Sequence, residues 1–253
     1  MKIAALFDIH GNLPALDAVL KETHKIGVDV YVIGGDALSG PMPAQTLERL
    51  RSLGKPSYFL HGNGESELLR FIATGKASGL TAKADAFAEV LASQLTEEQI
   101  AFLKSWQLTV TFELEHLGKV LFCHATPDSD VTIFTEETSD EELEGIFGRT
   151  TADLVICGHT HMQFERLFKG THIMNAGSVG MPFGSHGAYW LLLDEKAEQK
   201  RTPYDYQLAA SIIRDAKTPS AEDFVSHNLL SVPSKKDALA MMAALREKQV
   251  SHF

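Results

Sequence analysis

Short apolar runs alternate with amphipathic stretches over the first sixty residues. Residues 2–7, 28–33 and 57–60 are apolar runs of the length of a strand, and between them residues 14–25 and 44–53 have the spacing of helices. In the first of these predicted helices, Leu16, Val19 and Leu20 fall on one face. This order of elements is typical of a sheet with parallel strands that is covered by helices.

The pattern is helical from residue 65 to residue 106 and becomes strand-rich after it. Thr96 and Gln99 form a capping box ahead of an apolar helical face. Alternation at 108–114, a turn at 116–119 and an apolar run at 120–123 predict a β-hairpin. Further strands are expected at 154–157, 164–168, 171–175 and 188–193, with a helix at 140–147. We therefore expect two sheets packed face to face with helices outside.

The last fifty residues return to a helical pattern, at 206–215, 221–230 and 235–248. The predicted fold class is α/β, a two-sheet α-β-β-α sandwich with a helical insertion and a helical C-terminal extension. The predicted domain covers residues 1–203, with the insertion at about residues 66–105. The extension, residues 204–253, is expected to pack on the same domain.

The composition of the chain excludes several classes of protein. With 253 residues, 44% of them hydrophobic, the chain can bury a full core. Each apolar run is far shorter than the ~20 residues needed to cross a bilayer, and the N-terminal run reaches Asp8 too early for a signal peptide. Cys123 and Cys157 each end an apolar run, so we expect free, buried thiols in a cytoplasmic protein. The net charge of -10, with scattered Lys and Arg, argues against duplex nucleic acid as a binding partner.

Polar residues gather where the predicted strands end. The segments are Asp8-Ile9-His10, Gly34-Gly35-Asp36, Gly62-Asn63-Gly64-Glu65, His124, and Gly158-His159-Thr160-His161. Strand ends in sheets of this kind are where sites form, so one edge should collect Asp, Asn and His. These oxygen and imidazole ligands suit manganese, iron or zinc in a catalytic site. We expect Asp8 and His10 to bind the same metal ion, because alternate side chains of an extended segment point to one side.

These five motifs, in this order over residues 8–161, resemble the calcineurin-like metallophosphoesterases. The segment Asn175-Ala176-Gly177-Ser178-Val179-Gly180-Met181-Pro182 and the pair Tyr204-Asp205 are similar to a small bacterial branch that includes phosphodiesterases and diadenosine tetraphosphate hydrolases. The resemblance implies two divalent metal ions, manganese or iron or both, with zinc as an alternative. It implies that Asp8, His10 and His161 hold one ion, that Asn63, His124 and His159 hold the other, and that Asp36 bridges them.

The resemblance also implies the chemistry. Two ions about 3.5 to 4 Å apart produce hydroxide from a shared water for in-line attack, so no covalent nucleophile is needed. Asp36, Asn63 and His124 are then the residues expected at the reacting centre. The chain departs from the family pattern at Gly64, where many members have His, and at Phe183, near which relatives often have Arg. Absence of a general acid lowers the reaction rate least when the leaving group is already a stable anion and needs no proton. We therefore predict phosphodiesters or nucleoside polyphosphates as small-molecule substrates, rather than alkyl monoesters.

Several interpretations stay open. Each Asp alone could cap a helix and each His could be a satisfied core residue. Asn12 could cap the following helix or contact phosphate, and His61 or His186 could replace the missing phosphate contact. A phosphomonoesterase, or a non-catalytic interaction protein on the same fold, are the rival functions. The native metals, the physiological substrate and a homo-oligomeric state are not determined by the sequence.

Overall fold

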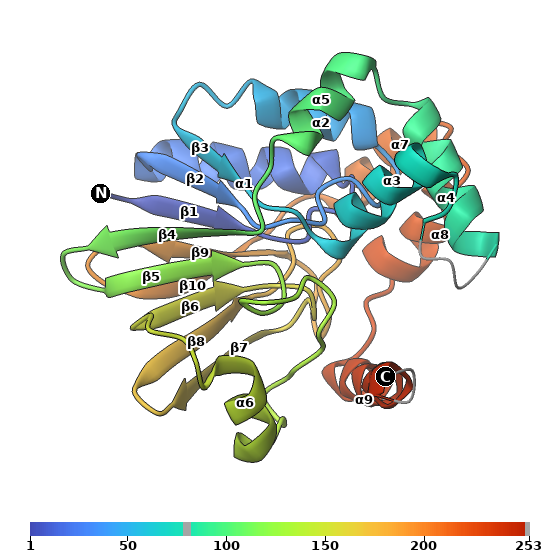
Figure 1. Cartoon of the computed structure of the whole chain (residues 1–253). Helices are drawn as coiled ribbons and strands as arrows, with labels where there is room; N and C mark the ends of the chain where they lie inside the picture. The colour runs from blue at the N-terminus through green and yellow to red at the C-terminus, as the bar shows by residue number, and fades with distance from the viewer. Residues whose placement is uncertain (78–81, 251–253) are drawn as a thin grey trace.

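Two five-stranded sheets lie face to face in the computed structural model, which describes residues 1–77 and 82–250 (Figure 1). The first sheet has the order β10-β9-β1-β2-β3. Its strands are β1 (Ile3–Leu6), β2 (Val30–Ile33), β3 (Ser57–Phe59), β9 (Ala188–Leu193) and β10 (Ala197–Thr202). The β1, β2 and β3 strands are parallel, so their carboxyl ends meet at one edge, while β9 and β10 are antiparallel to their neighbours.

The second sheet has the order β4-β5-β6-β8-β7. Its strands are β4 (Thr109–Leu114), β5 (Gly118–Cys123), β6 (Leu154–Cys157), β7 (Gln163–Phe168) and β8 (Thr171–Ala176). The three central strands are parallel, and the edge strands β4 and β7 are antiparallel to them. The expected two-sheet α-β-β-α sandwich is confirmed.

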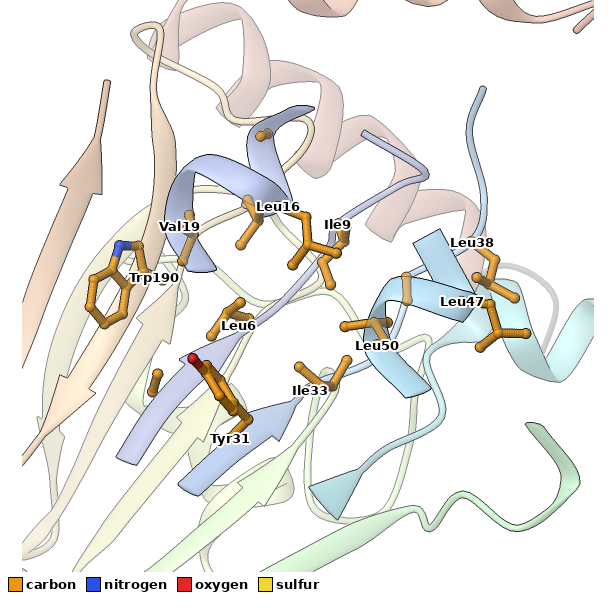
Figure 2. Close-up of a cluster of buried hydrophobic side chains, with 14 of the residues drawn as sticks. Leu6, Ile9, Leu16, Val19, Tyr31, Ile33, Leu38, Leu47, Leu50 and Trp190 are labelled. Carbon is orange, nitrogen blue, oxygen red and sulfur yellow. The ribbon is translucent and has the colours of Figure 1, made fainter. Parts of the chain in front are cut away.

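Helices cover the outer face of each sheet (Figure 1). The helices α1 (Leu13–Ile26) and α2 (Pro43–Arg51) lie over the first sheet, and α6 (Asp140–Phe147) lies on the second. Figure 2 shows Leu16 and Val19 of α1 near Leu6 of β1, and Leu50 of α2 facing Ile33 of β2. Burial of such side chains drives the packing at about 1.5 to 3 kcal/mol each.

A second apolar layer lies between the sheets. Ile3, Ala5 and Phe7 face it from β1 and the residue that follows, while Phe122 and Ile156 face it from the second sheet. Since Ala4 and Leu6 belong to the outer layer, β1 is buried on both faces. That explains why β1 is a continuous apolar run and does not alternate.

The predicted helical insertion consists of α3 (Asn63–Thr74), α4 (Ala82–Ser93) and α5 (Glu97–Lys104). The part of this prediction at residues 78–81 lies outside the described residues. The α3 helix begins directly where the chain leaves the first sheet, so its N-terminus lies at the edge formed by the strand ends.

The C-terminal segment contains α7 (Tyr206–Asp215), α8 (Ala221–Phe224), a π-helical turn (Val225–Leu229) and α9 (Lys235–Val250). The first three pack against Met42 and Met181, and α9 packs against Met162 and Phe183. Residues 251–253 of the predicted extension lie outside the described residues.

One strand was not predicted, and one predicted helix is present with a change of helical geometry. The β10 strand was missed because its sequence, Ala-Glu-Gln-Lys-Arg-Thr, shows little apolar alternation, as expected for an edge strand that faces solvent. The helix predicted over 221–230 changes to a π turn after four residues.

Cys123 and Cys157 are free and buried, as expected. Over residues 1–77 and 82–250, no helix has both the length and the apolar character needed to span a membrane.

Candidate metal centre

The carboxyl ends of strands from both sheets bring the predicted ligands together. Asp8 and His10 follow β1, and Asp36 follows β2. His124 follows β5 in the second sheet, and His161 lies just beyond β6. Ligand atoms of Asp8, His10 and His161 lie within 4.8 Å of one another, as do those of Asp8, Asp36 and His124. The two groups share Asp8, so they form one centre between the sheets.

The backbone at this centre is unusual. Of the residues other than glycine that have positive φ in the described structure, five belong to the predicted ligands: Asp8, His10, Asp36, His159 and His161, with φ between 48° and 67°. Such a conformation costs of order 1 kcal/mol or more per residue and persists at functional sites. It corrects one expectation, because Asp8 and His10 do not lie on an extended segment. Tight left-handed turns bring the His10 Nε2 to 3.8 Å from the Asp8 Oδ1.

Backbone carbonyls orient three of the imidazoles. The Nδ1 atoms of His10, His124 and His161 lie 3.0, 2.8 and 2.8 Å from the carbonyl oxygens of Ser39, Gly34 and Met181, respectively. Each Nδ1–H therefore donates to a carbonyl, which leaves the Nε2 lone pair directed at the centre. This is the tautomer and the orientation that a metal ligand requires.

Several buried polar atoms at the centre lack the partners that they need. The Asp8 Oδ1 and the His159 Nε2 are buried without a hydrogen-bond partner among the described residues. The Nε2 atoms of His10 and His161 lie 3.0 Å apart, although both carry lone pairs in the tautomers set by their carbonyl contacts. Orphaned buried acceptors are costly unless a cation satisfies them. The donor set therefore fits bound divalent metal ions.

Asp36 lies between the two groups of histidines. Its Oδ2 is 3.9 Å from the His10 Nε2, and its Oδ1 is 3.7 Å from the His124 Nε2. The same Oδ1 accepts a hydrogen bond of 2.7 Å from the Gly64 N–H. The Asn63 Oδ1 lies 3.3 Å from the His124 Nε2, so Asn63 faces the second group.

Two of the candidate ligands, His159 and Asp8, are held in the protonation states that bind metal, whereas burial would lower the pKa of His124 but the charges of Asp36 and Asp8 raise it. Burial lowers the pKa of His159 to about 4, and the neighbouring His124 acts in the same direction. Burial alone would raise the pKa of Asp8, but the charge of His161 and of the other histidines holds it well below its ordinary value. A neutral imidazole and an ionised carboxylate are the forms that bind metal.

Glycines allow the chain to come this close. A Cβ at Gly158 would overlap the Asp8 Oδ2, which accepts a hydrogen bond of 2.8 Å from the His159 N–H. Any side chain at position 158 would therefore push a ligand out of place.

Glu65 holds two parts of the centre together, and the sequence interpretation gave it no role. Its buried carboxylate accepts hydrogen bonds from the N–H groups of Asp36, Ala37, Leu38 and Gly62, at 2.7 to 3.3 Å. Burial raises the pKa of Glu65 to about 7, and the charge of Asp36 adds to the effect. The signal was its place three residues into α3, where a Glu typically caps the first turn.

The first of the three predicted substrate contacts, Asn12, makes its hydrogen bonds within the protein. The Asn12 side chain caps α1 by accepting from the Ala15 N–H, and it donates to the Gly180 carbonyl and the Tyr204 hydroxyl. Its polar atoms are thus used within the protein.

The two predicted histidine contacts pack against aromatic rings. The His61 ring lies 6.3 Å from that of Trp106, and burial lowers its pKa. The His186 ring lies 4.9 Å from that of Tyr206, and its Nε2 lies 3.3 Å from the Leu230 carbonyl. His186 therefore faces the C-terminal segment.

Metal addition is expected to stabilise the protein. Ions that bind the folded centre and not the unfolded chain, at a hundredfold excess over Kd, should raise Tm by about 5 to 10 °C. Thermal unfolding of the chelated protein with and without Mn²⁺ measures this. Equal Tm values, together with no metal retained after gel filtration, would contradict a metal centre here.

Comparisons with known proteins identify relatives of this chain. The sequence pattern of the calcineurin-like phosphoesterase superfamily domain matches residues 1–198. The chain is 28% identical over 243 residues to the uncharacterized protein MJ0912 of Methanocaldococcus jannaschii, covering 86% of this chain and 93% of the relative. It is 27% identical over 207 residues to the phosphodiesterase YfcE of Escherichia coli K12, covering 77% of this chain and 88% of YfcE.

The fold also matches solved structures. A metallophosphoesterase from Sphaerobacter thermophilus superposes with a TM-score of 0.70 at 23% identity, covering 91% of this chain and 98% of that one. The sequence match, which spans most of the chain, and the cluster of candidate metal ligands lead to one conclusion: the chain belongs to the calcineurin-like phosphoesterase superfamily.

Proposed function

We propose that the protein is a phosphodiesterase that works with two divalent metal ions, manganese, iron or zinc. Asp8, His10 and His161 would hold one ion, Asn63, His124 and His159 the other, and Asp36 would contact both. The observation that carries this proposal is a set of buried lone pairs that no donor meets: the Asp8 Oδ1 and the His159 Nε2 have no partner among the described residues, and the Nε2 atoms of His10 and His161 face each other. Bound cations would satisfy all of them.

When bound, such ions lower the pKa of a coordinated water and neutralise charge on a phosphoryl group. The contribution of the protein is to hold the ligands in place before substrate arrives. Carbonyl contacts fix the imidazoles, and Glu65 fixes the turn that carries Asp36. No covalent nucleophile is needed, and burial raises the pKa of the Cys123 and Cys157 thiols, so neither is a thiolate at neutral pH.

The surroundings of the centre support a diester as substrate. A cavity of about 330 Å³ lies against His124 and is lined by Leu108, Thr126 and Pro127. A space of this size accommodates the second ester group of a diester. Gly64, at the start of α3, brings no acid that could protonate an alkoxide leaving group, which favours esters whose leaving group is a stable anion. YfcE, a relative at 27% identity, carries the name phosphodiesterase.

The charge of the cavity favours diesters over polyphosphates. Asp128 and Asp130 line it, and Asp130 accepts a hydrogen bond of 2.5 Å from the Ser66 hydroxyl. Asp128 is paired with Arg149 at 2.6 Å, whereas Asp130 has no ion pair with a Lys or Arg within residues 1–77 and 82–250. A polyphosphate tail in this cavity would meet a like charge, so we expect nucleoside polyphosphates to be weaker substrates than a singly charged diester.

The test is an activity panel on the chelated protein reloaded with Mn²⁺, Fe²⁺ or Zn²⁺. We expect bis-p-nitrophenyl phosphate to be cleaved with a higher kcat/KM than p-nitrophenyl phosphate, and dinucleoside polyphosphates to fall between them. Chelated protein without added metal serves as the control. A preference for the monoester would replace the diesterase with a phosphomonoesterase. Absence of hydrolysis with every metal, by protein that contains two metals per chain, would favour a non-catalytic binding protein.

A further inference from the structure

Gly64 and Ser39 meet at one point beside the metal centre. A Cβ placed on Gly64 would overlap the Ser39 Oγ, would lie 3.3 Å from the Ser39 Cβ, and would be 3.0 Å from the Asp36 Oδ1. The serine hydroxyl therefore occupies the space into which a side chain at position 64 would grow. That space adjoins Asp36, the residue proposed to contact both ions.

The main-chain carbonyl of Ser39 is held by a hydrogen bond, whereas its side-chain hydroxyl makes none among the described residues. The Ser39 carbonyl oxygen lies 3.0 Å from the His10 Nδ1, so the residue is anchored to a metal ligand through its main chain. Ser39 is half-buried, and among the described residues its hydroxyl has no hydrogen-bond partner. A donor held at an active centre without a partner of its own can bind a group of the substrate.

We propose that the Ser39 hydroxyl donates a hydrogen bond to a non-bridging phosphoryl oxygen of the substrate. This assignment rests on the proposed phosphoesterase function. A serine hydroxyl is neutral and does not give up its proton at neutral pH, so it stabilises phosphoryl charge and does not protonate the leaving group. Gly64 is needed because only a residue without a side chain leaves the hydroxyl in this position.

The N-terminus of α3 supports the same assignment. The helix is twelve residues long and begins at Asn63, so its positive end faces this space. The N–H groups of Gly62 and Gly64 already donate to Glu65 and Asp36, so this helix end would act on a phosphoryl group beside Ser39 through its dipole and not through these N–H groups.

The first experiment measures binding of inorganic phosphate to the Mn²⁺-loaded protein by calorimetry, together with kcat/KM for bis-p-nitrophenyl phosphate. Ser39→Ala is expected to weaken phosphate binding and to lower kcat/KM, each by about tenfold to a hundredfold, as for loss of a hydrogen bond to a charged group. Metal content should be unchanged, because His10 is held by the Ser39 carbonyl and not by its hydroxyl. Ser52→Ala, an exposed serine at the end of α2, is the matched control and should change neither value.

The second experiment is a double-mutant cycle. Gly64→Ala alone should weaken phosphate binding about as much as Ser39→Ala, because the new methyl group displaces the hydroxyl. The same change made in the Ser39→Ala background should cost clearly less, since the hydroxyl is already gone and only the close contact of the new Cβ with the Asp36 Oδ1 remains. Tm should change little in either case, because the overlapping group in the wild-type background is a hydroxyl that can rotate, and alanine is a better helix former than glycine.

The outcomes separate this assignment from the proposed function. Binding of phosphate that depends on Ser39, in a protein that cleaves no diester, would keep the assignment and overturn the phosphodiesterase. Diester cleavage and phosphate binding that stay within twofold in Ser39→Ala would overturn the assignment and keep the phosphodiesterase. Loss of metal from Ser39→Ala, or additive effects in the cycle, would show a structural role and would also overturn it.

Discussion

Asp36→Asn is expected to lower the metal-dependent diesterase activity on the order of a thousandfold. The carboxylate lies 3.7 Å from the His124 Nε2 and 3.9 Å from the His10 Nε2, so both groups of ligands would lose one negative charge. Charge stabilisation by bound metals contributes several kcal/mol, and about 1.4 kcal/mol corresponds to a tenfold change in rate. Activity and metal content of the reloaded protein measure the effect.

The same change should not harm the fold. In the metal-free protein Asp36 lies close to Asp8. Burial and the charge of Asp36 together raise the pKa of Glu65. Removing this charge relieves repulsion among buried carboxylates, so the Tm of the chelated variant should equal or exceed that of the chelated wild type. The gain in Tm on adding Mn²⁺ should be lost. Asp215→Asn, an exposed position at the end of α7, is the control. Activity of Asp36→Asn within tenfold of wild type would contradict a shared role for this carboxylate.

Glu65→Ala should cause the largest loss of stability among the changes considered. It leaves four backbone N–H groups, those of Asp36, Ala37, Leu38 and Gly62, without their acceptor. A buried donor without a partner costs about 1 to 3 kcal/mol, and entry of water reduces the sum, so we expect a loss of about 3 to 5 kcal/mol. Urea unfolding of the chelated protein measures this. Metal affinity should fall as well, because the turn that carries Asp36 is released.

Gln99→Ala is a matched control for Glu65→Ala. Gln99 occupies the same capping position in α5, where its side chain accepts from the Thr96 N–H at 3.0 Å, but it has no contact with the metal centre. Loss of a cap alone costs about 1 kcal/mol and should leave metal binding intact. If the two variants lost equal stability and both kept their metal, Glu65 would be an ordinary cap and not a support of the site.

Much of the fold follows from short-range patterns. The strand β6 and the helices α6 and α7 have the predicted bounds, because β6 is a continuous apolar run, the helices have a clear apolar periodicity, and all three have sharp polar limits. The β10 strand has no such pattern. It is held by pairing with its neighbour β9 in a hairpin, and the apolar sequence of β9, not that of β10, indicates a strand there.

The types and order of the candidate ligands could be predicted from sequence, but their local geometry could not. Asp8 and His10 were expected on an extended segment, whereas both adopt positive φ. Strain of this kind persists only when surrounding structure enforces it, and here the turn is held by hydrogen bonds from the His10 N–H to the Asp36 carbonyl and from the Gly11 N–H to the Ala37 carbonyl. These contacts join segments more than twenty residues apart.

A two-sheet fold with Asp, Asn and His at its strand ends could be predicted from the amino-acid sequence, because periodicity and polar residues at strand limits are local properties of the chain. The folded structure was needed to learn that Glu65 supports the turn of Asp36, that His186 packs near Tyr206, and that the Ser39 hydroxyl adjoins Gly64. These relations depend on the distance between backbone segments that meet when the sheets pack, and spacing along the chain carries no information about that distance.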